Sequence, residues 1–403
     1  ILNVNKINPV GGGSTITIAG IASVTSSVTA PSFVGAVTGN VTGNVTGNVT
    51  GDATGLSGNP SINTTGIVTA TSFVPTVGQL SHRNILINGD FRIAQRGTSS
   101  TSSGIHSVDR FGVWHDNTDE APTQAQVDVA SGTTPYTLGF RKALKVTNGN
   151  QTGGAGVGDY IWIQNNLEAQ DIANSGWNYT SSSSFITLQF WVKSSVAQDF
   201  KCYLRTRDGT ERQYPFSTGS LTADTWTKVT KTIPGNSGLT FDNDVNQGFQ
   251  INIGCFFGDN LTSAATNENA WTAWNSSMRT KVFTPTWYTT NDATFEITGV
   301  QLEVGPVATP FEHRSFGDEL RRCQRYYQVG SNIGAGYGSA NGYARAGCTF
   351  ATQMRTTPTF TATNTGSGSI IATDRSNTGF YVTYGSLSGT SAGIFSFTAS
   401  AEF

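Results

Sequence analysis

Charged residues are scarce in this chain: Asp, Glu, Lys and Arg make up 12% of its 403 residues, about half of the usual share. The formal net charge is only −2, so the chain lacks the broad electrostatic attraction that draws proteins to nucleic acid or to anionic membranes. Glycine, in contrast, is abundant, with 47 residues. This composition argues against a soluble helical enzyme and favours an all-β protein of the extracellular or virion type.

Long apolar runs are also absent. No stretch of about 18 apolar residues occurs, so no segment is expected to span a bilayer. No secretory signal is visible, and the chain starts at Ile1 rather than Met, so some N-terminal residues are expected to be missing. The 8 Trp, 12 Tyr and 23 Phe residues are too many for an intrinsically disordered chain.

Cysteine is rare, with four residues: Cys202, Cys255, Cys323 and Cys348. None belongs to a CxxC pair, and their spacing indicates neither a zinc site nor a disulfide framework. We therefore expect buried free thiols, which fits synthesis in a reducing cytoplasm. The four histidines show no HxH or HExxH spacing, so no metal or other cofactor is expected.

The segment Val37–Thr54 contains the tetrapeptide VTGN three times, followed by VTGD. In an extended chain its valines and glycines would share one face. One such ribbon buries too little apolar surface to offset the entropy of ordering its glycines. Three copies around a common axis would bury the valines against each other, so we predict a homotrimeric shaft over residues 1–80. The predicted core residues of this shaft are Val37, Val41, Val45, Val49, Phe33 and Phe73. A flexible linker is the alternative, although regular β-branched residues are unusual in linkers.

Residues 81–315 contain many short alternating strands separated by polar turns, which predicts a β-sandwich of the jelly-roll type. A short linking helix is predicted over residues 316–328, with Ser315 as its N-cap and Asp318 three residues later. Residues 329–403 are predicted to form a small C-terminal β domain at the tip of the molecule. The expected fold class is therefore all-β.

Two motifs resemble a known family. The opening RNILINGDF at residues 83–91 and the closing ITGVQLEVG at residues 297–305, followed by ATPFEHR at 308–314 and CQRYY at 323–327, resemble bacteriophage tail-fibre and appendage proteins. The VTGN array is similar to N-terminal regions of such proteins from marine cyanobacterial phages. The segment NILINGDF also resembles carbohydrate-binding modules with a galactose-binding-like jelly roll.

This resemblance implies a trimeric virion appendage that is attached by its N-terminus, with β domains facing the host. Jelly rolls that resemble sugar-binding modules often carry a structural calcium, for which Asp90 and Glu303 are the candidate ligands. Gly299 stands where such modules often carry an acidic residue, and calcium needs six to eight oxygens. The sequence does not supply that set, so no calcium is predicted.

An enzymatic constellation is not evident, because no GxSxG motif or P-loop occurs. Phage appendages that cleave glycans use paired carboxylates, but the spacing selects no pair. The acidic loop residues that would be candidates are Asp116, Asp119, Glu120, Asp208, Glu211, Asp242, Asp244 and Asp259. We therefore expect no enzyme activity and no catalytic residue.

Glycan binding is the more plausible chemistry, because sugar rings stack on aromatic side chains while their hydroxyls pair with planar polar groups. The predicted carbohydrate-binding residues lie in polar loops rich in aromatic residues: Trp271, Trp274, Asn269, Trp177, Tyr337 and Tyr343. Each of them has buried packing or a plain loop as its alternative. Trp162, Trp191 and Trp226 lie inside alternating strands and are expected in the core.

The function expected from the sequence is a non-enzymatic, homotrimeric phage tail fibre that attaches to host-surface glycan or protein by multivalent binding. It would be located on the virion, made in the host cytoplasm, and docked to other virion proteins through its N-terminal region. Nucleic acid and membrane insertion are not expected. A head-attached fibre or spacer without receptor binding, and a surface-polysaccharide depolymerase, remain alternatives.

Overall fold

The structure is a computed structural model that describes residues 81–335, 342–387 and 393–403. The predicted shaft of residues 1–80 lies outside these ranges. Within them β-strands dominate, which confirms the all-β class. The helical elements are short: α1 (Thr134–Thr137), α2 (Ala169–Ala173), the 3₁₀ turn η2 (Asp259–Leu261), α3 (Thr286–Thr289) and α4 (Phe316–Gln324).

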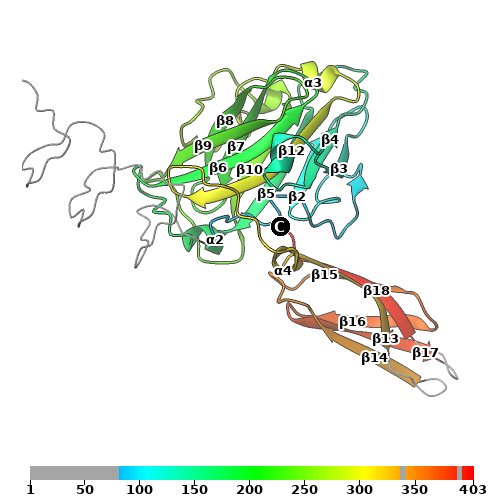
Figure 1. Cartoon of the computed structure of the whole chain (residues 1–403). Coiled ribbons are helices and arrows are strands. Elements are labelled where there is room, and N and C mark those ends of the chain that lie inside the picture. Colours follow the sequence, from blue (N-terminus) through cyan, green and yellow to red (C-terminus); the bar gives the residue numbers. More distant parts are fainter. Residues whose placement is uncertain (1–80, 336–341, 388–392) are drawn as a thin grey trace, which may run out of the picture. The chain divides into compact units, whose positions relative to one another are not determined.

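Two six-stranded sheets form a β-sandwich between residues 99 and 304 (Figure 1). The first sheet contains, in spatial order, β1 (Ser99–Ser100), β3 (Thr123–Asp128), β4 (Lys142–Thr147), β12 (Thr294–Val304), β6 (Phe185–Ser194) and β9 (Thr227–Pro234). The second contains β11 (Thr272–Ala273), β8 (Arg212–Ser220), β7 (Asp199–Thr206), β10 (Gln247–Phe257), β5 (Tyr160–Glu168) and β2 (Phe111–Asp116).

In each sheet, a strand from late in the sequence lies between two strands that come earlier in the sequence. Strand β12 pairs with β4 and β6, and β10 pairs with β5 and β7, in each case antiparallel. This nesting of distant segments is typical of jelly rolls. The facing sides of the sheets share one apolar core, to which Ile163 of β5, Leu188 of β6 and Ile253 of β10 belong. Burial of these alternate positions is what fixes the register of the strands.

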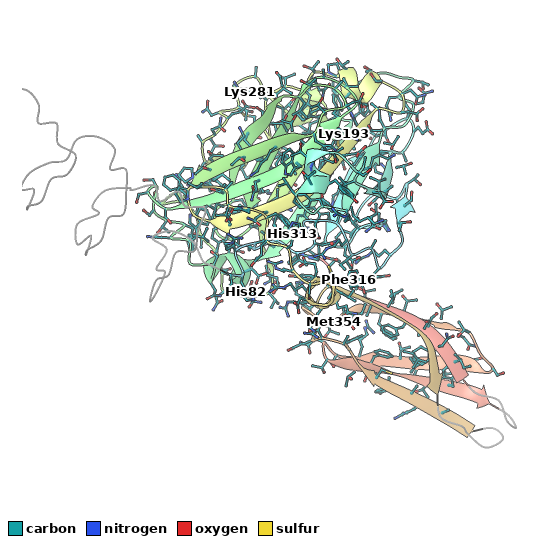
Figure 2. All side chains as sticks on the ribbon, viewed as in Figure 1. His82, Lys193, Lys281, His313, Phe316 and Met354 are labelled. Carbon is teal, nitrogen blue, oxygen red and sulfur yellow. The ribbon has the colours of Figure 1, made fainter. Side chains whose placement is uncertain are left out.

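Helix α4 confirms the predicted helix but ends at Gln324, before the expected limit of residue 328. The chain changes conformation here because strand β13 begins at Tyr327. The predicted cap is present, since the Ser315 hydroxyl accepts a hydrogen bond from the backbone N–H of Asp318 at 3.1 Å. Figure 2 labels Phe316 at the start of this helix, where its side chain is exposed.

The C-terminal strands form two three-stranded sheets (Figure 1). One contains β13 (Tyr327–Ala335), β18 (Gly393–Ser400) and β15 (Thr359–Asn364), and the other contains β14 (Gly342–Thr349), β17 (Gly379–Leu387) and β16 (Ser369–Arg375). Their small core includes Met354, Phe380 and Phe395, and the Met354 side chain, labelled in Figure 2, is fully buried.

All four cysteines are free thiols. Cys202, Cys255 and Cys323 are buried as predicted, while Cys348 is half-buried. Burial raises the pKa of Cys255 and of Cys323, so these thiols are poor nucleophiles. Among the described residues, none of the helices has the length and apolar character that crossing a membrane requires.

Candidate functional site

The outward face of the second sheet carries aromatic and amide side chains on β5 and β10. In β5 the buried residues Ile161 and Ile163 alternate with Trp162 and Gln164. Side chains of a strand point to opposite faces at successive positions. Because Ile161 and Ile163 belong to the core between the sheets, Trp162 and Gln164 lie on the outward face.

Four side-chain amides are hydrogen-bonded in a row across β5 and β10, and we call them the amide ladder. Gln250 donates to Asn166 (3.3 Å), Asn166 to Gln164 (3.4 Å) and Gln164 to Asn252 (2.8 Å). The register places the pairs opposite each other, with Gln250 beside Asn166 and Asn252 beside Gln164. The row ends at the Asn252 Nδ2 group, which is buried and has no hydrogen-bond partner. A buried donor without a partner costs free energy, and this one has no surface that a ligand could reach in this structure.

An aromatic cluster continues this face beyond the amide ladder. The Trp162 ring lies 4.4 Å from that of Tyr160 and 5.3 Å from that of Phe257, between ring centroids. Tyr203 of β7 lies 5.7 Å from Trp274. Trp162 and Trp274 are both half-buried, and the Trp162 Nε1 donor has no partner. The Trp162 donor is buried, whereas the half-buried indole rings suit a ligand that offers C–H faces.

Two arginines lie over these rings. The guanidinium carbon of Arg205 is 3.7 Å from the centroid of the Trp274 ring, and Arg205 Nε donates to Glu211 at 2.9 Å. The guanidinium carbon of Arg279 lies 5.3 Å from the Trp162 centroid and 5.8 Å from the Trp274 centroid. Such cation–π contacts hold the rings in place.

The structure places the predicted binding residues in different environments. Trp274 lies in the aromatic cluster. Trp271 is half-buried, packs 5.3 Å from Tyr214 and donates Nε1 to the Pro234 carbonyl at 2.7 Å, so it anchors its loop. Asn269 is exposed, with a positive φ of 59°.

Trp177 is a core residue, because only 3% of it is exposed and it packs against Tyr179 and Phe241. Its ring therefore presents no face to a ligand in this structure. Tyr337 and the side chain of Tyr343 lie outside the described residues.

Trp162 was expected in the core; it is half-buried and packs against the main apolar core, but from the outward face of the second sheet. Trp191 and Trp226 are half-buried against a small cluster around Phe140, so they also retain exposed surface. The amide ladder was not predicted at all. Its signal is present in the sequence, since Gln164 and Asn166 repeat at a spacing of two in β5, as Gln250 and Asn252 do in β10.

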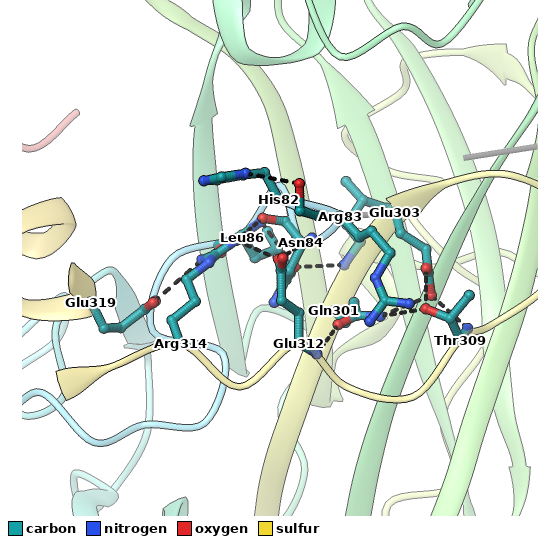
Figure 3. A network of polar contacts seen from close by, with 12 residues as sticks. His82, Arg83, Asn84, Leu86, Gln301, Glu303, Thr309, Glu312, Arg314 and Glu319 are labelled. Atoms are coloured by element: carbon teal, nitrogen blue, oxygen red, sulfur yellow. Dashed lines mark hydrogen bonds and ion pairs between the residues drawn. The ribbon is translucent and has the colours of Figure 1, made fainter. Parts of the chain in front are cut away.

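The opening and closing motifs meet in a polar network (Figure 3). The Asn84 side chain donates to the Val300 carbonyl and accepts from the backbone N–H groups of Leu86 and Leu302. Arg314 donates to the Leu86 carbonyl at 2.9 Å and pairs with Glu319 at 3.3 Å. These residues therefore hold the opening motif, residues 83–91, against strand β12 and helix α4.

The same region accounts for Gly89 and for the candidate calcium ligands. A Cβ atom at Gly89 would lie 2.0 Å from the Val300 carbonyl oxygen, so only glycine fits. Glu303 accepts hydrogen bonds from the backbone N–H of Thr309 and from Gln301, and Asp90 pairs with Arg92. Within the part of the chain that the structure describes, no three His, Cys, Asp or Glu side chains gather as a metal site would require.

Several loop carboxylates that were considered for catalysis act as acceptors in loops. Asp119 accepts from the backbone N–H of Gly153 at 2.5 Å and Glu120 from that of Asn150 at 2.7 Å. Asp208 accepts from the backbone N–H of Asp242 at 3.1 Å. Burial raises the pKa of Asp208, and nearby Asp242 and Asp244 raise it further. These contacts close turns, which is the role that turn residues commonly have.

Comparison with known proteins gives no family model and no curated protein that matches this chain. Solved structures with a similar arrangement include the enzymatically active domain of bacteriophage CBA120 tailspike protein 4, at 11% identity and a TM-score of 0.29, over 55% of this chain and 21% of that chain. A CBM4 structure is similar at 13% identity and a TM-score of 0.28, over 54% of this chain and 98% of the other. The N-terminal cellulose-binding domain of Cellulomonas fimi β-1,4-glucanase C is similar at 12% identity and a TM-score of 0.26, over 54% and 99%.

Proposed function

We propose that this chain is a non-enzymatic virion appendage of a bacteriophage, a tail fibre that attaches to host-surface glycan through the outward face of the second sheet of its β-sandwich. One observation supports this most directly. The half-buried rings of Trp162 and Trp274 lie on this face together with the half-buried amide of Gln164. Sugar C–H groups would pack on the rings while sugar hydroxyls pair with the Gln164 amide.

The appendage part of the proposal is supported by the VTGN array and by the opening and closing motifs. A shaft of three chains would hold three glycan-binding faces together. Individually weak sites then act with a high effective concentration, so that attachment becomes firm. The N-terminal region would dock to other virion proteins, and the protein would be located on the assembled particle.

Binding of the full chain to an array of bacterial surface oligosaccharides tests the glycan site. Trp162→Ala and Trp274→Ala should each weaken binding about tenfold, which corresponds to about 1.4 kcal/mol. Trp226→Ala is the matched control, because Trp226 is equally half-buried but packs against the small cluster around Phe140. Equal loss in all three variants, or no loss in any, would overturn the proposed site. The appearance of new reducing ends during incubation would indicate a depolymerase instead.

Native mass measurement of the full chain tests the trimeric shaft. The unmodified protein should have three times the mass of one chain. Replacing Val37, Val41, Val45 and Val49 by Asp should reduce it to one, because the charges would be buried in the predicted shaft. A stable monomer before substitution would contradict the appendage.

A further inference from the structure

On the outward face of the second sheet, most cations have a carboxylate partner. Glu211 is shared by Arg205 and Arg207, each within 2.9 Å. Lys201 pairs with Asp199 at 2.6 Å and with Glu268 at 3.5 Å. These three cations are therefore neutralised by three carboxylates.

Arg279 is the additional cation. None of the ion pairs among the described residues includes it. Its Nε donates to the backbone carbonyl of Ser276 at 3.1 Å, and the residue is half-buried. Asp116, which is exposed on β2 opposite Tyr160, lies near Tyr160 as Arg279 does, but it does not form an ion pair with Arg279.

The position of Arg279 places its charge where a bound sugar would lie. Its guanidinium lies over both Trp162 and Trp274, the two rings on which we expect the sugar to pack. Burial raises the pKa of Tyr203, while Arg279 and Arg205 act in the opposite direction, which is consistent with both guanidinium groups lying near that phenol. An arginine fork binds carboxylate and sulfate groups through paired hydrogen bonds.

From this geometry we infer that the glycan bound by this face is acidic, and that Arg279 pairs with a carboxylate or sulfate group of the sugar. This inference rests on the proposed glycan-binding function. It adds the class of the glycan and the residue that selects it. Charge-assisted hydrogen bonds contribute about 1.5–3 kcal/mol, so an acidic sugar should bind at least about tenfold more tightly than its neutral counterpart.

The test uses the full chain and three sets of oligosaccharides on matched backbones: neutral, uronic-acid-containing and sulfated. The wild-type protein should prefer one or both acidic sets by about tenfold, and the two acidic arms show which anion is bound. Raising NaCl to about 1 M should weaken binding of the acidic sets much more than binding of the neutral set.

Arg279→Gln should abolish the preference for acidic sugars, measured as the ratio of acidic to neutral binding within the same variant, and Arg279→Lys should restore part of that preference because it keeps the charge. Arg141→Gln is the matched control, since Arg141 also lies over an aromatic ring, 3.9 Å from the Tyr136 centroid, and donates to backbone carbonyls. Equal binding of neutral and acidic sets by the wild type, or a preference that persists in Arg279→Gln, would overturn the inference and leave the glycan site standing. Failure of all three sets to bind would overturn the proposed function as well.

Discussion

The Asn84 side chain joins the opening motif at residues 83–91 to strand β12. Its side-chain oxygen accepts from the backbone N–H groups of Leu86 (3.0 Å) and Leu302 (3.1 Å), and its Nδ2 donates to the Val300 carbonyl (3.2 Å). The side chain is 3% exposed, so water does not replace these bonds when it is removed. A single amide therefore holds the opening motif against the closing one.

Replacing Asn84 by Ala should lower the free energy of unfolding by about 3 kcal/mol, because two buried N–H groups and one carbonyl lose their partner. Denaturant unfolding of the two proteins measures this. Asn291→Ala, in an exposed turn, is the matched control and should change stability by less than about 0.5 kcal/mol. Equal stability of Asn84→Ala and the wild type would show that the network does not hold the sandwich together.

Asp171 is a second residue for which the structure predicts a measurable effect, in this case on the pH dependence of stability. It lines a cavity of about 290 Å³ together with Arg322 and Arg325. Burial, and after it the neighbouring Glu168, raise its pKa from 3.8 to about 6, although Arg325, Arg110 and Arg322 act in the opposite direction. The folded protein therefore holds a proton on this carboxyl at pH values where the unfolded chain has released it.

Stability should consequently fall as pH rises from about 4 to 6, since the folded state binds more protons than the unfolded state in that window. Asp171→Asn removes this titration. Its free energy of unfolding, relative to that of the wild type, should increase by about 2 kcal/mol between pH 4 and pH 7. Chemical denaturation across this range measures the difference, with Asp292→Asn in an exposed turn as the control. A constant difference would contradict the raised pKa.

At the scale of elements, α4 is held at both ends. Its N-terminus is capped by Ser315, which accepts from the Asp318 backbone N–H and donates to the Asp318 carboxylate at 2.6 Å. Asp318 and Glu319 lie in the first turn, where carboxylates suit the positive end of the helix. Just after its last residue, Arg325 forms two hydrogen bonds with the buried Glu168 at 2.6 and 2.7 Å.

Removing the cap by Ser315→Ala should cost about 1 kcal/mol of stability, whereas Ser315→Asp should keep nearly all of it. Thermal unfolding of both variants gives the comparison. Ser102→Ala, on the exposed surface, should be neutral. If Ser315→Ala is as stable as the wild type, the cap does not contribute to the helix.

At the scale of the whole molecule, the stability of the described part depends on charges that are buried where the C-terminal strands contact the β-sandwich. Arg110 is 2% exposed and pairs with Glu402, which also binds Arg96 at 3.2 Å. The Arg110 guanidinium carbon lies 3.4 Å from the centroid of the Tyr326 ring. Removing one member of a buried pair leaves the other charge without compensation, which is more costly than losing a surface pair.

Glu402→Gln should therefore lower the unfolding free energy by about 3 kcal/mol and separate the unfolding of the C-terminal strands from that of the sandwich. Calorimetry shows this as two transitions. Asp128→Asn removes a carboxylate from an exposed pair, since the Asp128 side chain is 81% exposed and 2.6 Å from Lys142, and it should cost less than about 1 kcal/mol. One unchanged transition in Glu402→Gln would contradict the coupling.

Much of this architecture could be predicted from local patterns. Alternation of apolar and polar residues in segments such as 160–163, together with the cap at Ser315, was enough to predict the strands and helix α4, because both are set by interactions between near neighbours. The helix end was missed by a few residues, since pairing of β13 with the distant strand β18 determines where the helix stops.

The site depended on the tertiary structure for a different reason. Period-two alternation separates two faces of a strand, but it does not say which face meets the other sheet when both carry large side chains. Trp162 was therefore expected in the core although it faces outward, and Trp177 was considered for binding although it is buried. The amide ladder joins residues more than 80 positions apart in β5 and β10. Only the folded structure shows that Arg279 lies on the same face without a carboxylate partner. Local sequence determined which elements form, and only long-range packing decided which side chains they present to a ligand.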